Sequence, residues 1–108
     1  MEPDRPLVRD VFPDLVSELT ALLVDEGEHD LAICVQDVRL VGECDCGDGF
    51  CQSIRTADHP RGQPYGAGHR CVPLSPSEGM LILDVVDSRI MYIEVLDRLP
   101  MRRRGAER

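Results

Sequence analysis

The C-terminal third of the chain holds two apolar segments of alternating hydrophobicity, Met80 to Val86 and Ile90 to Leu96, separated by a short polar turn. Side chains along a strand point alternately to opposite faces, so this pattern predicts a β-hairpin with one buried face. No other part of the sequence restricts the fold as strongly, because an apolar sheet face must be covered by another layer.

The register of this hairpin follows from its polar residues. If Val86 pairs with Ile90, one face is entirely apolar, with Leu81, Leu83, Val85, Met91, Ile93 and Val95. A two-residue turn would instead place Asp84 beside Met91 and would mix polar and apolar side chains on each face. A slip of one residue exchanges the faces, so we expect a three-residue turn with a bulge at residues 87–89.

Two segments near the N-terminus have the periodicity of helices. Pro13 to Glu26 carries Leu15, Leu19, Leu22 and Leu23 in one apolar stripe, with proline in the first turn and Gly27 as the stop signal. A second helix is expected from about Asp30 to Gln36, with Cys34 on its core face as a small buried side chain. Residues 1–10 are polar and contain two prolines, so we expect them to be extended.

Shorter strands are expected between the helices and the hairpin. We predict a pair of strands at Arg39 to Cys44 and Phe50 to Thr56. We predict an edge strand at Cys71 to Leu74, because this segment contains Pro73. Residues 57–70 contain three glycines and two prolines and are predicted to be a loop, which at that length is often functional. The second, less apolar hairpin face is either partly covered by this loop or used for self-association.

These elements predict an α+β fold in which two N-terminal helices pack on an antiparallel sheet of four to five strands. The leucine stripe would cover the apolar face of the last hairpin. A chain of 108 residues suits one domain, which we place at residues 1–100. The remaining residues, 101–108, are rich in arginine and are expected to form a basic, disordered tail.

The net charge is −8, with 20 acidic residues against 12 arginines and no lysine. This balance argues against a nucleic-acid groove and favours either simple solubility or a basic protein partner. The start of the chain does not resemble a signal peptide, and no apolar run approaches about 18 residues, so no membrane partner is expected. We therefore expect a cytoplasmic protein, whose thiols would be reduced.

Three of the five cysteines lie within eight residues, in the sequence Cys44-Asp45-Cys46-Gly47-Asp48-Gly49-Phe50-Cys51. At a hairpin tip, the two glycines would allow Cys44, Cys46 and Cys51 to converge on a zinc ion. A closed site needs a fourth ligand. We prefer His69, with Cys71 and then His59 as alternatives, since the Cys71 side chain is expected to face the core. Free thiols, a Cys44–Cys51 redox pair or a reactive thiolate remain open.

Acidic neighbours favour a metal over catalysis at this cluster. Glu43, Asp45 and Asp48 would raise the pKa of the thiols, which weakens a nucleophile but attracts a cation. No signature of a cysteine–histidine enzyme or of a phosphate-binding loop is present, so no catalytic residue is assigned. Asp84 and Glu94 share one face of the hairpin, and we interpret them as part of a solvated surface.

The spacing of several short motifs is similar to that of a known group of proteins. Cys44-x-Cys46-Gly47-Asp48-x-x-Cys51, the run Gly79 to Asp87 and the run Ile93 to Asp97 resemble small uncharacterised proteins of GC-rich actinobacteria, over residues 12–98. That resemblance implies no activity. Such proteins tend to carry glycine at the position of Ser88, so this turn is expected to be less easily formed here.

The sequence thus predicts a small, non-enzymatic protein whose zinc-binding cysteine knuckle, with the 57–70 loop, stabilises the fold and contacts a protein partner. A different class remains open, namely an acidic inhibitor or immunity-type protein that binds a basic partner, with structural or redox-active cysteines. A thiol-dependent enzyme is the third reading. Homo-oligomerisation through the sheet is also open.

Overall fold

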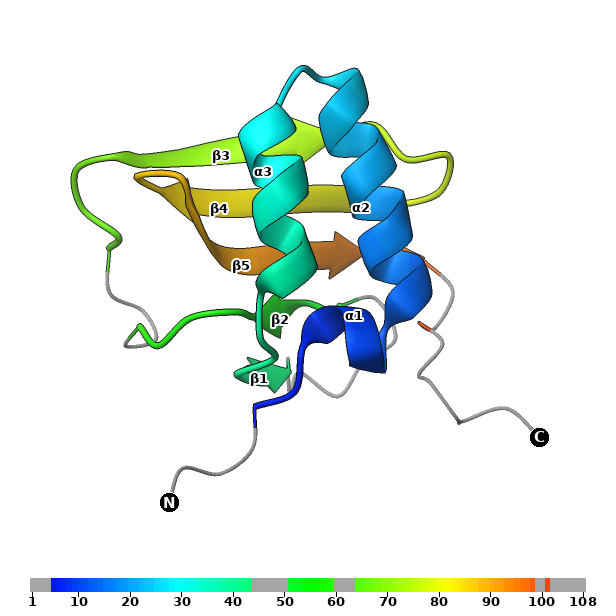
Figure 1. The fold of residues 1–108 in the computed structure, drawn as a ribbon, viewed down its shortest axis with the longest axis horizontal. Coiled ribbons are helices and arrows are strands. Elements are labelled where there is room, and N and C mark those ends of the chain that lie inside the picture. The colour runs from blue at the N-terminus through cyan, green and yellow to red at the C-terminus, as the bar shows by residue number, and fades with distance from the viewer. Residues whose placement is uncertain (1–4, 44–50, 60–63, 99–100, 102–108) are drawn as a thin grey trace.

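The computed structural model describes residues 5–43, 51–59, 64–98 and 101, which form α-helices followed by a β-sheet (Figure 1). The described helices are α1 (Val8–Val11), α2 (Pro13–Asp25), α3 (His29–Cys34) and the 3-10 helix η1 (Val35–Asp37). The described strands are β1 (Gly42–Glu43), β2 (Ile54–Arg55), β3 (His69–Leu74), β4 (Met80–Val86) and β5 (Arg89–Leu96).

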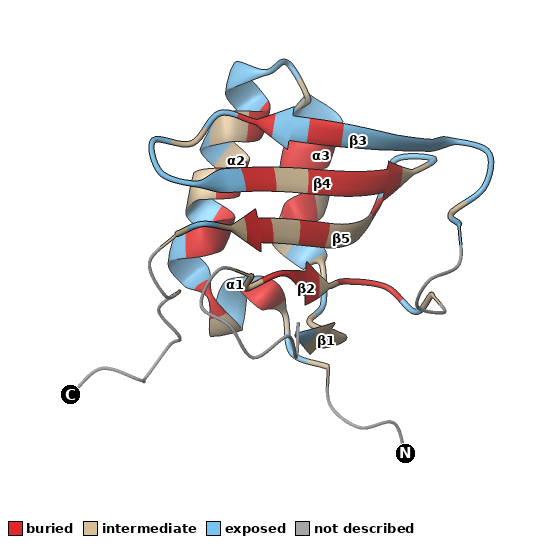
Figure 2. Ribbon diagram, turned by 180° about the vertical axis from the view of Figure 1, so that it is seen from behind, coloured by how far each residue is buried: buried red, intermediate tan, exposed pale blue. Residues whose placement is uncertain are grey.

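The five strands form one antiparallel sheet in the order β1-β2-β5-β4-β3. Helices α2 and α3 lie side by side across one face of it (Figure 1). Seen from behind, the strands face the viewer and no described helix covers them (Figure 2). The predicted α+β class, with N-terminal helices packed on one face of an antiparallel sheet, is confirmed.

The core lies between α2 and the central hairpin. Leu19 and Leu23 of α2 are fully buried, as are Leu81 and Leu83 of β4. All four belong to one continuous apolar cluster, so the leucine stripe meets the apolar hairpin face as predicted. Cys34 is half-buried and packs against this cluster, in agreement with its predicted position on the core side of α3.

The N-terminal segment differs from the prediction, because residues 8–11 form α1 and are not extended. Tertiary contacts explain the difference. Leu7 forms an isolated antiparallel bridge with Arg39, and the Val8 N–H donates to the carbonyl of Val38 at 2.9 Å. Val8 is then fully buried in the core, where a turn of helix satisfies its backbone.

The turn of the β4–β5 hairpin also differs from the prediction. Val86 pairs with Arg89, so the turn has two residues, Asp87 and Ser88, with φ of 49° and 72°. This is the conformation of a tight hairpin turn. The bulge lies instead within the strands, between the pairs Asp84↔Tyr92 and Val85↔Ile90.

The displaced bulge leaves Met91 as the extra residue of β5. Its carbonyl accepts a hydrogen bond from the Thr56 N–H at 3.0 Å, and Ile90 replaces Met91 in the buried set. Beyond the bulge the predicted register holds, with Leu83 opposite Ile93 and Leu81 opposite Val95. The apolar face therefore survives, because the shift is absorbed inside the hairpin and not in its turn.

The remaining predictions on the sheet hold in outline. Strand β3 is an edge strand, as Pro73 indicated, although it begins at His69. Strands β1 and β2 are shorter than predicted, and the turn expected between them lies at residues 44–50, outside the described part. Residues 57–59 and 64–68 contain no helix or strand, as expected for the loop.

Met101, the first residue after the predicted domain end, is in contact with the fold. It packs against the core, and its N–H donates to Gln52 Oε1 at 2.6 Å, while residues 102–108 lie outside the described part. Among the described helices, none is both long and apolar enough to cross a membrane.

Candidate metal centre

A row of side chains crosses the sheet on its uncovered face. The strand register aligns Cys71 of β3 with Asp84 of β4 and Asp84 with Tyr92 of β5. Leu83, which precedes Asp84, is fully buried in the core under the helices. Neighbouring residues of a strand point to opposite faces, so Asp84 and its row lie on the outer face.

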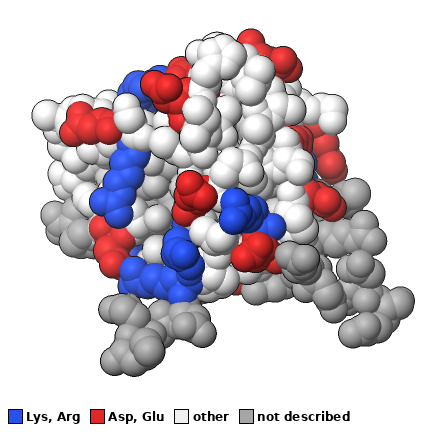
Figure 3. Space-filling model, in the orientation of Figure 1, with Lys and Arg blue, Asp and Glu red and all other residues white. Residues whose placement is uncertain are grey.

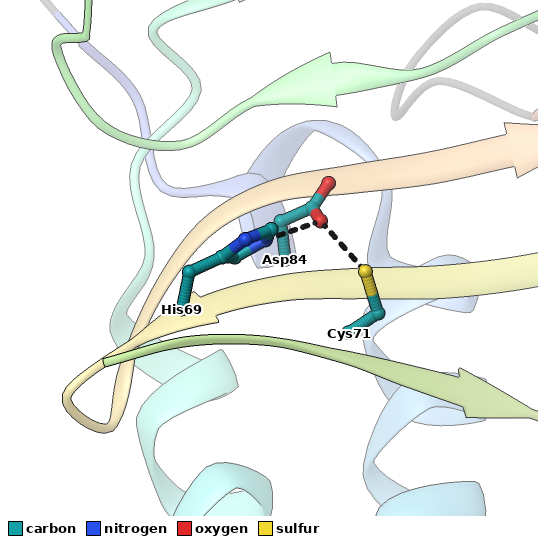
Figure 4. A group of neighbouring side chains, drawn as sticks. All are labelled: His69, Cys71 and Asp84. Carbon is teal, nitrogen blue, oxygen red and sulfur yellow. Dashed lines mark hydrogen bonds and ion pairs between the residues drawn. The ribbon is translucent and has the colours of Figure 1, made fainter. Parts of the chain in front are cut away.

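His69 joins this row because it lies two residues before Cys71 on β3. In Figure 4 the imidazole of His69 and the thiol of Cys71 both point toward the carboxylate of Asp84. His69 Nε2 lies 2.9 Å from Asp84 Oδ1, and Cys71 Sγ donates to the same oxygen at 3.3 Å. One carboxylate oxygen therefore connects a nitrogen and a sulfur ligand from the neighbouring strand.

The carboxylate at the centre of this group is the least exposed member. Asp84 is 7% exposed, whereas His69 and Cys71 are both open to solvent. A buried carboxylate is costly unless donors or cations compensate its charge. The two donors from β3 provide that compensation, and they leave the group accessible from the solvent side.

The loop before β3 covers part of this group. The ring of Tyr65 lies 4.7 Å from the His69 ring and 4.4 Å from the His59 ring, measured between centroids. Burial raises the pKa of Tyr65, and the charges of Asp84 and Glu94 raise it further. Tyr65 thus lies against the acidic row, which agrees with the expectation that the loop covers some of the outer face.

Acidic groups make the surroundings of Cys71 favourable for a cation. The hydrogen bond to Asp84 raises the pKa of the Cys71 thiol, as do burial and the charges of Asp84 and Glu94. The pKa of Glu94 is itself raised, first by burial and then by Asp84. Without a metal, the thiol is therefore a poor nucleophile. A divalent ion would reverse this balance, since it stabilises thiolate and carboxylate together.

The donor set suits a zinc-like ion. The ligand atoms of His69, Cys71 and Asp84 all lie within 4.8 Å of one another. Zinc binds imidazole, thiolate and carboxylate at about 2.0–2.3 Å, which places neighbouring ligands of a tetrahedral site about 3.5 Å apart. Small side-chain rotations would bring the three atoms to these separations. Three protein ligands would leave one position for water or for a further residue.

The predicted four-ligand set is not assembled within the described part of the chain. Cys44 and Cys46 lie outside the described residues, so the three-cysteine knuckle stays a prediction. Cys51 bridges Leu96, which pairs with Met80, whereas His69 pairs with Val86 at the other end of β4. Met80 and Val86 are six positions apart along β4, which corresponds to about 20 Å in a strand. Cys51 and His69 are therefore too far apart to share one ion.

Two expectations about individual residues were wrong. The Cys71 side chain was expected to face the core, but it faces outward, because Val72 and Leu74 take the buried positions of β3. Asp84 was interpreted as part of a solvated surface, but it is buried and hydrogen-bonded. His59, the third alternative ligand, contacts Tyr65 and is not a member of the group.

One signal in the sequence could have indicated Asp84. It is the only charged residue of β4, within the run Leu81-Ile82-Leu83-Asp84-Val85-Val86. A lone carboxylate inside an apolar strand needs a partner.

Comparison of the chain with protein-family models, with curated proteins and with solved structures gave no match, so the resemblance to small actinobacterial proteins stays a prediction.

Proposed function

We propose that this protein is a non-enzymatic metal-binding protein that holds a zinc-like divalent ion through His69, Cys71 and Asp84. The convergence of nitrogen, sulfur and oxygen ligands within 4.8 Å carries the proposal. The pKa of Cys71 is raised by its hydrogen bond to Asp84, by burial and by the charges of Asp84 and Glu94, and these two carboxylates would also attract a cation. A reducing compartment, such as the predicted cytoplasm, would keep the thiol available.

The ion would stabilise the edge of the sheet. His69 and Cys71 belong to edge strand β3, and Asp84 belongs to its neighbour β4. A bound ion would link the two strands through side chains in addition to the backbone ladder, and its binding energy would add to the stability of the fold. Tyr65 and the described loop residues around it, 64–68, would lie beside it and form the surface offered to a protein partner.

Metal analysis of cysteine variants tests this proposal and separates it from the predicted knuckle. The triple variant Cys44→Ser, Cys46→Ser, Cys51→Ser removes the knuckle and keeps the His69, Cys71 and Asp84 group. We expect it to bind one equivalent of zinc, and to give with cobalt(II) a charge-transfer absorption from a single thiolate. Adding Cys71→Ser should abolish that absorption and weaken binding at least about tenfold.

Cys34→Ser is the matched control, because Cys34 lies at the end of α3 with its thiol directed to the Ser88 carbonyl. It should leave metal binding unchanged. The proposal is wrong if the triple variant binds no metal, or if Cys71→Ser binds as well as its parent. Metal bound by the unaltered chain but lost in the triple variant would assign the ion to the knuckle instead.

A further inference from the structure

A second feature of the surface is a pocket of about 490 Å³ that shares no residue with the metal centre. It lies where the end of α3 and η1, the β4–β5 turn and the residues after β2 meet the N-terminal segment. Its lining includes the arginines Arg5, Arg39 and Arg89. Pockets of a few hundred Å³ are the size that small organic ligands occupy.

The pocket has an excess of basic residues in an otherwise acidic chain, because three arginines and two aspartates line it. In Figure 3, basic side chains follow one another down the left of the helix-bearing face, with acidic side chains between them. Arg5 is held by Asp58 through two hydrogen bonds of 2.8 and 3.1 Å. Within the described residues, neither Arg39 nor Arg89 forms an ion pair with a carboxylate. Two guanidinium groups are therefore available to an anion from solution.

The acidic residues of the lining form their ion pairs with arginines other than Arg39 and Arg89. Asp58 is engaged by Arg5, and Asp37 lies 3.8 Å from Arg9. The pKa of Asp58 is held below its usual value by its hydrogen bond from Arg5 and by the charges of Arg5, Arg55 and Arg89. The carboxylate of Asp58 thus experiences a positive potential to which Arg89 contributes.

Apolar residues contribute to the rest of the lining. Val38, Val41 and Ile90 line the same pocket as the arginines. Arg39 is held in place, because its Nη1 donates to the carbonyl of Arg5 at 2.8 Å. The volume is much larger than a single oxyanion needs. The pocket therefore combines a positioned basic end with an apolar surface.

We propose that this pocket binds a small organic anion, whose oxyanion group contacts Arg39 and Arg89 while its apolar body packs on Val38 and Val41. Arginine recognises carboxylate and phosphate groups alike through paired N–H donors. The headgroup of the ligand is thus an oxyanion, either a carboxylate or a phosphate. The acidic body of the protein argues against a polyanion such as nucleic acid.

Amide NMR titrations of the full chain test the proposal, with phenyl phosphate, phenylacetate and inorganic phosphate as probes. We expect saturable shifts confined to the pocket residues, with at least one organic probe binding more tightly than inorganic phosphate. The preference between the first two probes identifies the headgroup. Arg39→Gln combined with Arg89→Gln should weaken binding at least about tenfold. Each variant removes a charged hydrogen bond to the oxyanion, and such bonds contribute strongly to the binding free energy.

Arg70→Gln is the control, since it removes the same charge outside the lining and should change affinity less than about twofold. If the double variant does not fold, Arg89→Lys at the exposed first position of β5 keeps the charge but loses the paired donors, and should still weaken binding. Shifts that do not saturate, or equal affinity in the Arg89 and Arg70 variants, would overturn the proposal.

Discussion

Cys71 and Asp84 occupy directly opposed positions on β3 and β4, and the Cys71 thiol donates a hydrogen bond to Asp84 Oδ1 at 3.3 Å. The same oxygen lies 2.9 Å from His69 Nε2. Three residues that are separated by up to 15 positions in the sequence thus meet at one atom. This contact is the basis of the proposed metal centre.

Zinc should protect Cys71 from alkylation. The thiol would become a metal ligand, so saturating zinc should slow its reaction with iodoacetamide at least about tenfold, while Cys34 reacts at an unchanged rate. Peptide mass spectrometry of the alkylated protein resolves the two cysteines. Asp84→Asn should remove the protection. Equal slowing at Cys71 and Cys34 would indicate a general effect of zinc and not a site.

Replacing Gly79 by alanine should destabilise the fold more than replacing Gly27. Both glycines have positive φ, 68° and 78°, where a side chain costs about 1–2 kcal/mol. A Cβ at Gly79 would also collide with Arg98 and with the backbone carbonyls of Leu96 and Asp97, whereas a Cβ at Gly27 would meet open space. Urea unfolding of the two variants measures the difference. Equal losses of unfolding free energy in the two variants would show that the residues around Gly79 move to accommodate the methyl group.

Ser88→Gly should stabilise the protein. Ser88 has φ of 72° at the second position of the two-residue turn, and glycine adopts this conformation without the steric cost of a Cβ. We expect the free energy of unfolding to rise by about 0.5–1 kcal/mol, measured by urea denaturation. Ser77→Gly, before β4, serves as the control, because Ser77 does not have a positive φ. A loss of stability in Ser88→Gly would contradict the turn geometry.

The ion pair between Glu28 and Arg70 should make a small, pH-dependent contribution. Its two hydrogen bonds of 3.0 Å hold the pKa of Glu28 below its usual 4.5. The stabilisation is therefore full above the unfolded pKa and is lost as the pH falls through the lower, folded value. Glu28→Gln should cost about 0.5 kcal/mol at pH 7, because exposed pairs are screened by solvent.

This difference between Glu28→Gln and the parent should vanish in acid and shrink at high salt. Denaturant unfolding at several pH values measures it. Glu26→Gln provides the control, since it removes an exposed neighbouring charge with no ion pair among the described residues. A difference that persists at low pH would show that the hydrogen bonds do not depend on the charge of Glu28.

Much of the fold could be predicted from local patterns of apolar residues in the sequence. The stripe of Leu15, Leu19 and Leu23 predicted α2, and the alternation around Leu83 and Ile93 predicted the central hairpin with its buried face. These patterns are reliable because a period of 3.6 or of 2 directly determines which side chains share a face. Pro73 likewise indicated an edge strand, because proline has no backbone N–H to donate and fits where that side of the strand has no neighbour.

The candidate metal centre depended on information that local pattern does not contain. The sequence by itself determined that Cys71 lies in a strand and that Asp84 is a charge within an apolar strand. Only the tertiary structure decided that this strand begins at His69, that His69 and Cys71 point to the outer face of the sheet, and that the three groups meet. That decision depends on the pairing of β3 with β4 and on the bulge at Met91, which are set by long-range backbone hydrogen bonds and core packing.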